Sequence, residues 1–185
     1  MISYVYSIGH GKKTIDEFLL ELHSFDIEYL IDIRSKPYSK YCPHFSQDDL
    51  RKSLEKQNIF YVYMGKELGG LPVHDSTCFT EDGRVDYDKL KEKDFFRKGM
   101  ERLFVANSKG IRVCIMCSES NPIDCHRSKL IGEELLIYGI YLQHIIGISK
   151  SKSQSQINED LTNGTFIGMF GDEISANMTS KKRYL

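Results

Sequence analysis

The sequence predicts an α/β fold in which helices cover both faces of a mostly parallel sheet of about five strands. Two observations predict it. Short, apolar, β-rich runs alternate along the first 149 residues with segments that carry apolar side chains at helical spacing. Parallel strands that follow one another through helices need right-handed crossovers, and these crossovers place helices on both faces of the sheet.

The predicted elements follow one another in a regular order. Strands are expected over residues 3–10, 27–34, 59–64, 110–117 and 140–148, and helices over residues 14–25, 46–58, 93–107 and 121–138. Thr14 and Glu17 have the spacing of a capping box, and Asn121 followed by Pro122 is typical of a helix start. Residues 65–90 are rich in glycine and are expected to form a long loop.

Residues 1–149 are expected to form one domain, and residues 150–185 a polar linker with a C-terminal tail. From Lys150 the composition becomes polar and low in complexity, so we expect residues 150–159 to be mobile. The tail has one apolar cluster that is too short to fold alone. We expect this cluster to dock on the domain or on a partner chain; it consists of Phe166, Ile167, Met169 and Phe170.

Composition narrows the class of protein. The formal net charge of −1 gives no general argument for nucleic acid as a partner, although a local basic patch leaves that partner open. No stretch approaches the roughly 20 apolar residues of a membrane span, and the N-terminus has no pattern of a secretion signal. The five cysteines are an odd number in a chain of 185 residues, which favours free thiols in a reducing, cytoplasmic environment.

Residues that can carry chemistry follow the predicted strands. Ligands of a parallel α/β sheet bind outside the carboxyl ends of its strands, so these residues are expected to meet at one edge. The candidates for catalysis are Cys117, Glu119, Cys125, His126 and Glu67. The candidates for substrate binding are His10, Asp32, Arg34, Gly69, Gly70 and Arg127.

The spacing assigns roles to some of these candidates. Cys117 is the last side chain of the strand face that also holds Ile115, so its thiol is expected at the mouth of the site, where nearby cations would acidify it. On a helix that begins at Asn121, Arg127 falls on the apolar stripe and Cys125 points away from it. A buried arginine needs a charge, so we expect Arg127 and Arg34 to hold an anionic group at that helix start.

Each candidate also has a structural interpretation. Asp32 and Arg34 can form an ordinary ion pair, the glycines after Leu68 can serve loop conformation alone, and free cysteines are often small buried hydrophobic residues. The cofactor stays undetermined: the sequence has no dinucleotide fingerprint and no phosphate-loop spacing. Cys114 and Cys117 begin on opposite faces of a strand, which disfavours a thioredoxin-like pair. A zinc site is an open alternative, with ligands drawn from Cys117, Cys125, His126 and either Cys42 or His44.

Several segments together resemble the family called domain of unknown function 488. The resemblance covers about residues 3–146 and rests on YSIGHGKKTIDEFLLEL, LIDIRSKPYSKYCPHF, YMGKELGG and VCIMCSESNPIDCHRSKLIGEEL. It implies a small Rossmann-like α/β domain of a soluble prokaryotic protein, and it names no reaction. One departure is Gly11, where the family often has serine.

Three functions are consistent with this pattern. The first is an enzyme that uses the cysteine, histidine, glutamate and arginine residues on an anionic, nucleotide-like small molecule. The second is a module that binds a nucleotide, another anion or nucleic acid without turnover. The third is a metal-binding or redox protein. The sequence does not determine the oligomeric state.

Overall fold

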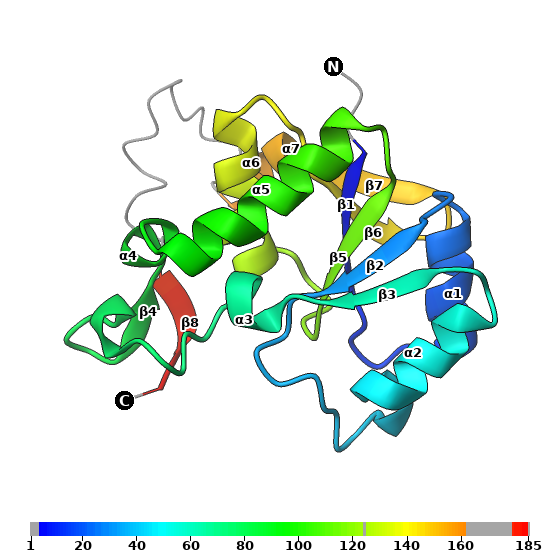
Figure 1. Cartoon of the computed structure of the whole chain (residues 1–185), viewed down its shortest axis with the longest axis horizontal. Coiled ribbons are helices and arrows are strands. Elements are labelled where there is room, and N and C mark those ends of the chain that lie inside the picture. Colours follow the sequence, from blue (N-terminus) through cyan, green and yellow to red (C-terminus); the bar gives the residue numbers. More distant parts are fainter. Residues whose placement is uncertain (1–3, 124, 162–178, 185) are drawn as a thin grey trace.

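The computed structural model describes residues 4–123, 125–161 and 179–184, and its centre is a six-stranded sheet with helices on both faces (Figure 1). In spatial order the strands are β3 (Phe60–Tyr63), β2 (Tyr29–Asp32), β5 (Val113–Cys117), β1 (Val5–Gly9), β6 (Gln143–Gly147) and β7 (Lys150–Ser153). All neighbours pair parallel except β6 and β7, which pair antiparallel. The predicted three-layer α/β fold is therefore confirmed.

Strand β5 lies in the middle of the sheet, and its five residues are all buried. Val113, Ile115 and Cys117 face one hydrophobic cluster, whereas Cys114 and Met116 face the other. The predicted alternation along this strand is confirmed. Cys114 and Cys117 consequently lie on opposite faces of the sheet, as a two-residue period requires.

Two helices cover one face of the sheet, α1 (Ile15–His23) and α2 (Gln47–Glu55). Phe18 and Leu22 of α1 pack there with Leu50 and Leu54 of α2. The predicted capping box begins α1: the Thr14 hydroxyl accepts a hydrogen bond from the Glu17 N–H at 3.2 Å, and the Glu17 carboxylate accepts one from the Thr14 N–H at 2.8 Å.

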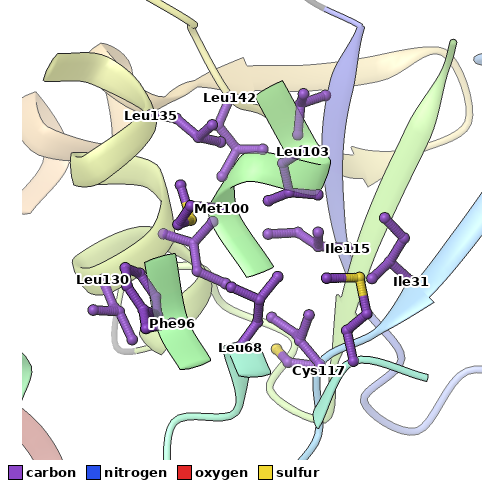
Figure 2. Close-up of a cluster of buried hydrophobic side chains, with 14 of the residues drawn as sticks. Ile31, Leu68, Phe96, Met100, Leu103, Ile115, Cys117, Leu130, Leu135 and Leu142 are labelled. Atoms are coloured by element: carbon purple, nitrogen blue, oxygen red, sulfur yellow. The ribbon is translucent and has the colours of Figure 1, made fainter. Parts of the chain in front are cut away.

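The other face is covered by α3 (Gly65–Leu68) and α5 (Asp94–Ser108), together with the helical segment after β5. Leu68, Phe96 and Met100 pack there against the sheet, and Cys117 belongs to the same buried cluster (Figure 2). This packing places the end of β5 at the edge of a hydrophobic core.

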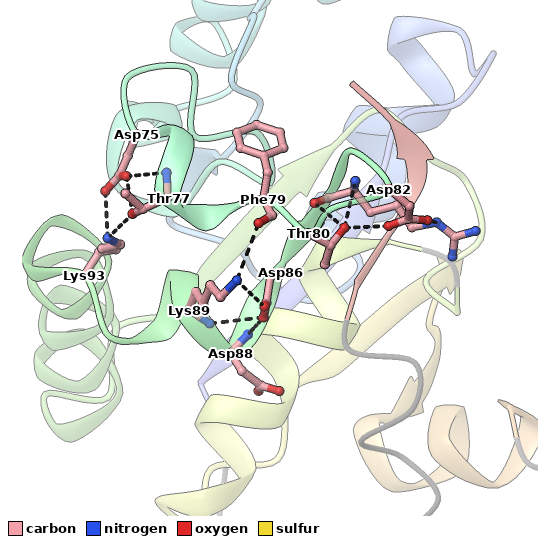
Figure 3. Close-up of polar contacts among 10 residues, drawn as sticks. Asp75, Thr77, Phe79, Thr80, Asp82, Asp86, Asp88, Lys89 and Lys93 are labelled. Carbon is pink, nitrogen blue, oxygen red and sulfur yellow. Dashed lines mark hydrogen bonds and ion pairs between the residues drawn. The ribbon is translucent and has the colours of Figure 1, made fainter. Parts of the chain in front are cut away.

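Residues 65–90 are not the irregular loop that the glycine content predicts. Besides α3, they form a 3₁₀ turn (Ser76–Cys78), strand β4 (Arg84–Asp86) and helix α4 (Tyr87–Lys91). Strand β4 pairs with β8 (Thr179–Arg183) in a separate two-stranded sheet. Polar contacts fix this region (Figure 3): Asp86 caps α4 and pairs with Lys89, while Lys93 pairs with Asp75 at 2.9 Å.

The helix after β5 does not begin at Asn121, and that prediction is wrong. The Asn121 side chain accepts a hydrogen bond from the Ile123 N–H at 3.1 Å, which closes a turn rather than a helix. The helix begins with a π-helical segment (Arg127–Gly132) and continues as α6 (Glu133–Ile137). Cys125 therefore precedes the helix, and helical spacing does not govern where its side chain points.

The segment after Lys150 is not a linker, because it forms β7 and helix α7 (Gln154–Leu161). Gln154 is fully buried and accepts a hydrogen bond at 2.8 Å from Nε2 of His144, whose Nδ1 lies 2.6 Å from the Ser7 hydroxyl. The Gln154 amide also donates to Ser128 and Glu133. The expected apolar cluster at residues 166–170 lies outside the described residues. No helix in the described part of the chain has the length and apolar character of a membrane span.

Candidate functional site

A cleft of about 590 Å³ opens at the carboxyl ends of β2 and β5. Segments that are distant in the sequence form its walls: Arg34–Lys36, Gly70–Leu71, Tyr87, Cys117–Asn121, Cys125–His126, Ser180–Lys182 and Tyr184. Among the described residues, the lining includes the cations Arg34, Lys36, Lys181 and Lys182 and one carboxylate, that of Glu119. The described part of the cleft wall is therefore rich in positive charge, although the whole chain is nearly neutral.

Two cysteine thiols meet in this cleft. The sulfur atoms of Cys117 and Cys125 lie 3.0 Å apart, and both residues are almost completely buried. Cys117 also lies within hydrogen-bond reach of the Glu119 carbonyl, at 3.6 Å, and the Cys125 sulfur lies 3.6 Å from Nδ1 of His126. The expectation that Cys125 points away from the apolar stripe is wrong, because the residue sits in the turn before the helix and belongs to the buried cluster.

The two thiols do not ionise alike. Burial alone would raise the pKa of Cys117, but the hydrogen bond from Cys125 and the nearby Arg127 guanidinium lower it below the ordinary cysteine value. Burial and the same hydrogen bond raise the pKa of Cys125 well above that value. The arrangement favours a Cys117 thiolate that is stabilised by a protonated Cys125.

The Arg34 guanidinium reaches the cleft from the end of β2, and Asp32 fixes its position. Nε of Arg34 donates to Oδ1 of Asp32 at 2.9 Å, and Nη2 donates to Oδ2 at 2.6 Å. The Tyr61 hydroxyl donates to Oδ2 of Asp32 at 2.7 Å. Asp32 is fully buried, so its role is to hold Arg34 rather than to contact a ligand. Arg34 is thus both a member of the predicted ion pair and a residue of the cleft wall.

Comparison with protein families gives one match. The family described as "Domain of unknown function DUF488" matches residues 14–133, which is more than half of the chain. The chain belongs to the DUF488 family. Comparison with curated proteins and with solved structures finds no match.

The DUF488 match is narrower than the resemblance described above. It includes the ends of β2 and β5 and all the candidate residues from Asp32 to Arg127, but His10 lies before it. His10 is nearly buried and stacks on Phe45, with 4.3 Å between ring centroids. Its Nδ1 lies 3.0 Å from the Gly11 carbonyl, and Nε2 lies 3.5 Å from Nη1 of Arg34. Burial, followed by the Arg34 charge, lowers the pKa of His10 to about 4. A neutral His10 therefore supports Arg34 from behind the cleft wall.

Arg127 of this DUF488 chain does not occupy the predicted position. It is completely buried, and Nη2 donates to the Ser120 carbonyl at 2.8 Å, whereas Nε and Nη1 have no hydrogen-bond partner among the described residues. Its guanidinium lies behind the cleft wall instead of among the lining residues, so it is not placed to pair with Arg34 on a ligand. The charge of Arg127 helps to lower the pKa of Cys117, so this buried cation favours the thiolate form of that residue.

The two glycines after Leu68 allow neighbouring segments to lie close to their backbone. A Cβ at Gly70 would lie 2.6 Å from Cγ of His126, and a Cβ at Gly69 would lie 2.2 Å from the Gly65 carbonyl oxygen. Gly69 has an ordinary φ of −67°, so a special backbone conformation does not explain it. Burial and then the Arg127 charge lower the pKa of His126 to about 4. Gly70 thus allows the loop to cover a neutral imidazole beside Cys125.

The two candidate glutamates lie in different places. Glu119 is exposed and lines the cleft beside Cys117. Glu67 lies on α3, and its Cβ would be 3.0 Å from a Cβ at Gly99 of helix α5. Among the described residues, the cleft lining does not include Glu67, and we no longer assign it a role in acid–base chemistry.

One group of side chains in the described residues could hold a metal ion. Ligand atoms of Cys117, Glu119 and Cys125 all lie within 4.8 Å of one another. The ligands suggested from the sequence are only partly brought together. Cys42 lies 3.8 Å from the Gly11 carbonyl, and Nε2 of His44 lies 3.0 Å from the Lys13 carbonyl, so both are engaged elsewhere.

Several cleft residues have no signal in the sequence. Tyr87 comes from the segment expected to be a loop, Lys182 comes from β8, and Tyr184 follows that strand. Burial and then the charge of Cys125 raise the pKa of Tyr87, so its hydroxyl stays protonated. Lys36 lies two residues after Arg34, and nothing in its local sequence distinguishes it from an ordinary surface lysine.

Proposed function

We propose that this DUF488 chain is an enzyme whose Cys117 thiolate acts on an anionic small molecule bound in the cleft. One observation carries the proposal: a thiol with a lowered pKa lines a cleft in which most of the other charged lining residues that the structure describes are cations. A thiolate is the nucleophilic form of cysteine, and a cationic wall concentrates anionic ligands around it.

The residues of the cleft would have different roles. Lys36 and Lys182 would bind the negative groups of the ligand, together with Arg34, which Asp32 holds in place. The Cys117 sulfur would form a bond to an electrophilic atom of the ligand while that atom loses its leaving group. Glu119 is the cleft side chain that could exchange a proton with the leaving group, and the Tyr87 hydroxyl could donate a hydrogen bond to it.

A module that binds anions without turnover would use the same cations. It would not need the hydrogen bond from Cys125 to Cys117, nor the guanidinium of Arg127 buried beside them. These two features favour the enzyme, because each stabilises a thiolate that simple binding does not require. Nucleotides and phosphorylated metabolites are the ligand class that best matches the charge of the cleft.

The test begins with thermal shift measurements against a panel of nucleotides and phosphorylated metabolites. A ligand at 100 times its dissociation constant should stabilise the protein by about 2.7 kcal/mol. Lys36→Glu with Lys182→Glu should abolish the shift, whereas Lys98→Glu with Lys129→Glu, at two lysines outside the cleft lining, serves as a charge-matched control. The Cys117→Ser protein should retain the shift and lose turnover of the same ligand. A shift that survives the double lysine variant, or turnover that survives Cys117→Ser, would contradict the proposal.

A further inference from the structure

The thiol pair allows chemistry that a lone nucleophile does not. Cys117 ends a β-strand and Cys125 follows the cleft loop, yet their sulfur atoms lie 3.0 Å apart. A disulfide bond has a length of about 2.05 Å, so the two atoms need to approach by only about 1 Å to form one. The loop between them includes the exposed residues Ser118, Glu119 and Ser120, which have no helical or strand structure. A loop of this kind can absorb such a movement.

Cys117 and Cys125 are both lining residues of the cleft, with 1% and 2% of each residue exposed. The other cysteines are placed differently. Cys114 is buried on the opposite face of the sheet, and Cys42 lies near Gly11. A small molecule that enters the cleft therefore meets two adjacent thiols and a wall that carries the side chains of Lys36 and Lys182.

We propose that Cys117 and Cys125 reduce a low-molecular-weight disulfide that carries negative charge. The activity goes beyond the proposed function, because it requires the second thiol as well as the first. Glutathione disulfide, with its four carboxylates, is a suitable probe of this chemical class.

The reaction consists of two exchange steps. The Cys117 thiolate attacks one sulfur of the small disulfide, a mixed disulfide forms on Cys117, and the first small thiolate leaves. Cys125 then loses its proton and attacks the Cys117 sulfur, which releases the second small thiolate and closes a Cys117–Cys125 disulfide. Two electrons pass from the protein dithiol to the small disulfide, and the two thiol protons end on the two released thiols.

The contacts of the pair set the order of attack. Either sulfur can donate the hydrogen bond between them, and Cys117 has the lowered pKa of the pair because that bond and the Arg127 guanidinium outweigh its burial. The Cys125 sulfur lies 3.6 Å from Nδ1 of His126, but the pKa of this imidazole, about 4, makes it a weak base, so the Cys125 proton passes to the small thiolate that leaves in the second step. Cys117 is thus the attacking thiol, and Cys125 is the resolving thiol.

The test uses the full-length reduced chain and two small disulfides, anionic glutathione disulfide and cationic cystamine. Mass spectrometry of peptides should show a Cys117–Cys125 disulfide in the wild type and no retained adduct. Cys125→Ser should hold one glutathione on Cys117, and Cys117→Ser should not react at this site. Cys114→Ser serves as the matched control and should behave as the wild type. At low salt the anionic disulfide should react roughly tenfold faster, and added salt should reduce this ratio.

Several results would overturn the inference. One is a wild-type protein that retains glutathione on Cys117, as the Cys125→Ser variant is expected to do. Cys125 would then not release the bound glutathione from Cys117. Another is a purified protein whose two thiols react only after a chelator removes a metal ion, which would make the pair a metal site. Equal rates with the two disulfides at low salt would contradict the charge selection. Turnover of another cleft ligand by Cys125→Ser would leave the proposed enzyme intact, so the two proposals fail separately.

Discussion

The Asp32 carboxylate holds the Arg34 guanidinium through two hydrogen bonds, of 2.9 Å and 2.6 Å, at the wall of the cleft. The pair is almost completely buried, and Nη2 of Arg34 also donates to the Phe45 carbonyl at 2.8 Å. Such a cation has little freedom to move. The same burial makes Arg34 dependent on its partner, because a lone buried charge is costly.

We therefore expect Asp32→Asn to lower the free energy of unfolding by about 3–5 kcal/mol, since it leaves Arg34 buried without a counter-charge. Urea denaturation measures this change. Asp26→Asn is the matched control, because Asp26 pairs with Arg112 at 2.7 Å on the surface and its loss should cost less than about 1 kcal/mol. Equal losses in the two variants would show that Arg34 does not depend on Asp32.

Cys125→Ala is expected to make Cys117 less reactive near neutral pH. The variant removes the hydrogen bond that helps to lower the pKa of Cys117, so a smaller fraction of this thiol is ionised at a given pH. The rate of alkylation by iodoacetamide, followed at the Cys117 peptide, should reach its plateau at a higher pH than in the wild type. Cys114, whose pKa is raised by burial, should stay unreactive in both proteins. An unchanged pH profile would exclude Cys125 as the stabilising donor.

Acid should weaken the contact between α7 and the sheet through His144. Burial lowers the pKa of His144 to about 4 from the ordinary 6.5, so between these pH values the unfolded chain binds a proton that the folded chain does not. The stability that depends on neutral His144 is present above pH 6.5 and is lost as the pH falls toward 4, by up to about 1.4 kcal/mol per pH unit.

The His144→Asn protein separates this effect from the titration of other groups. It should be less stable than the wild type at pH 7, and the difference in unfolding free energy between the two proteins should shrink by pH 5. Chemical denaturation at the two pH values measures the difference. A difference that stays constant would mean that His144 is protonated equally in the folded and unfolded chains.

Gly9→Ala should displace the loop that carries Glu119. A Cβ at Gly9 would lie 1.8 Å from the Glu119 carbonyl oxygen and 2.8 Å from Nη1 of Arg127. We expect a loss of about 1–3 kcal/mol in unfolding free energy, because backbone has to move, together with a changed reactivity of Cys117. Gly147→Ala is the control: its nearest atoms belong to the Lys150 side chain at 3.8 Å, and it should be nearly neutral. A Gly9→Ala protein as stable as this control would show that the loop is free to shift.

Local patterns predicted much of the fold correctly. The capping box at Thr14, the alternation along β5 and the ends of β2 and β5 depend on neighbouring residues and on the periods of strands and helices, and the sequence displays these directly. The segment after Lys150 was predicted wrongly, because that prediction also depended on local composition alone. Its polar composition indicates a linker, but Gln154 is buried because His144, Ser128 and Glu133 satisfy its amide.

By itself, the sequence determined that this is an α/β protein and that Arg34, Cys117 and Glu119 stand at the ends of its strands, because parallel strands end at a common edge. Only the tertiary structure decided what each residue meets there. It placed Cys125 against Cys117, moved Arg127 behind the cleft wall and left Glu67 outside the lining. It also placed two further residues in the cleft lining: Tyr87, which follows β4, and Lys182, which belongs to β8. Such contacts join segments that are far apart in the chain, and they depend on how loops close over the sheet, which no local period records.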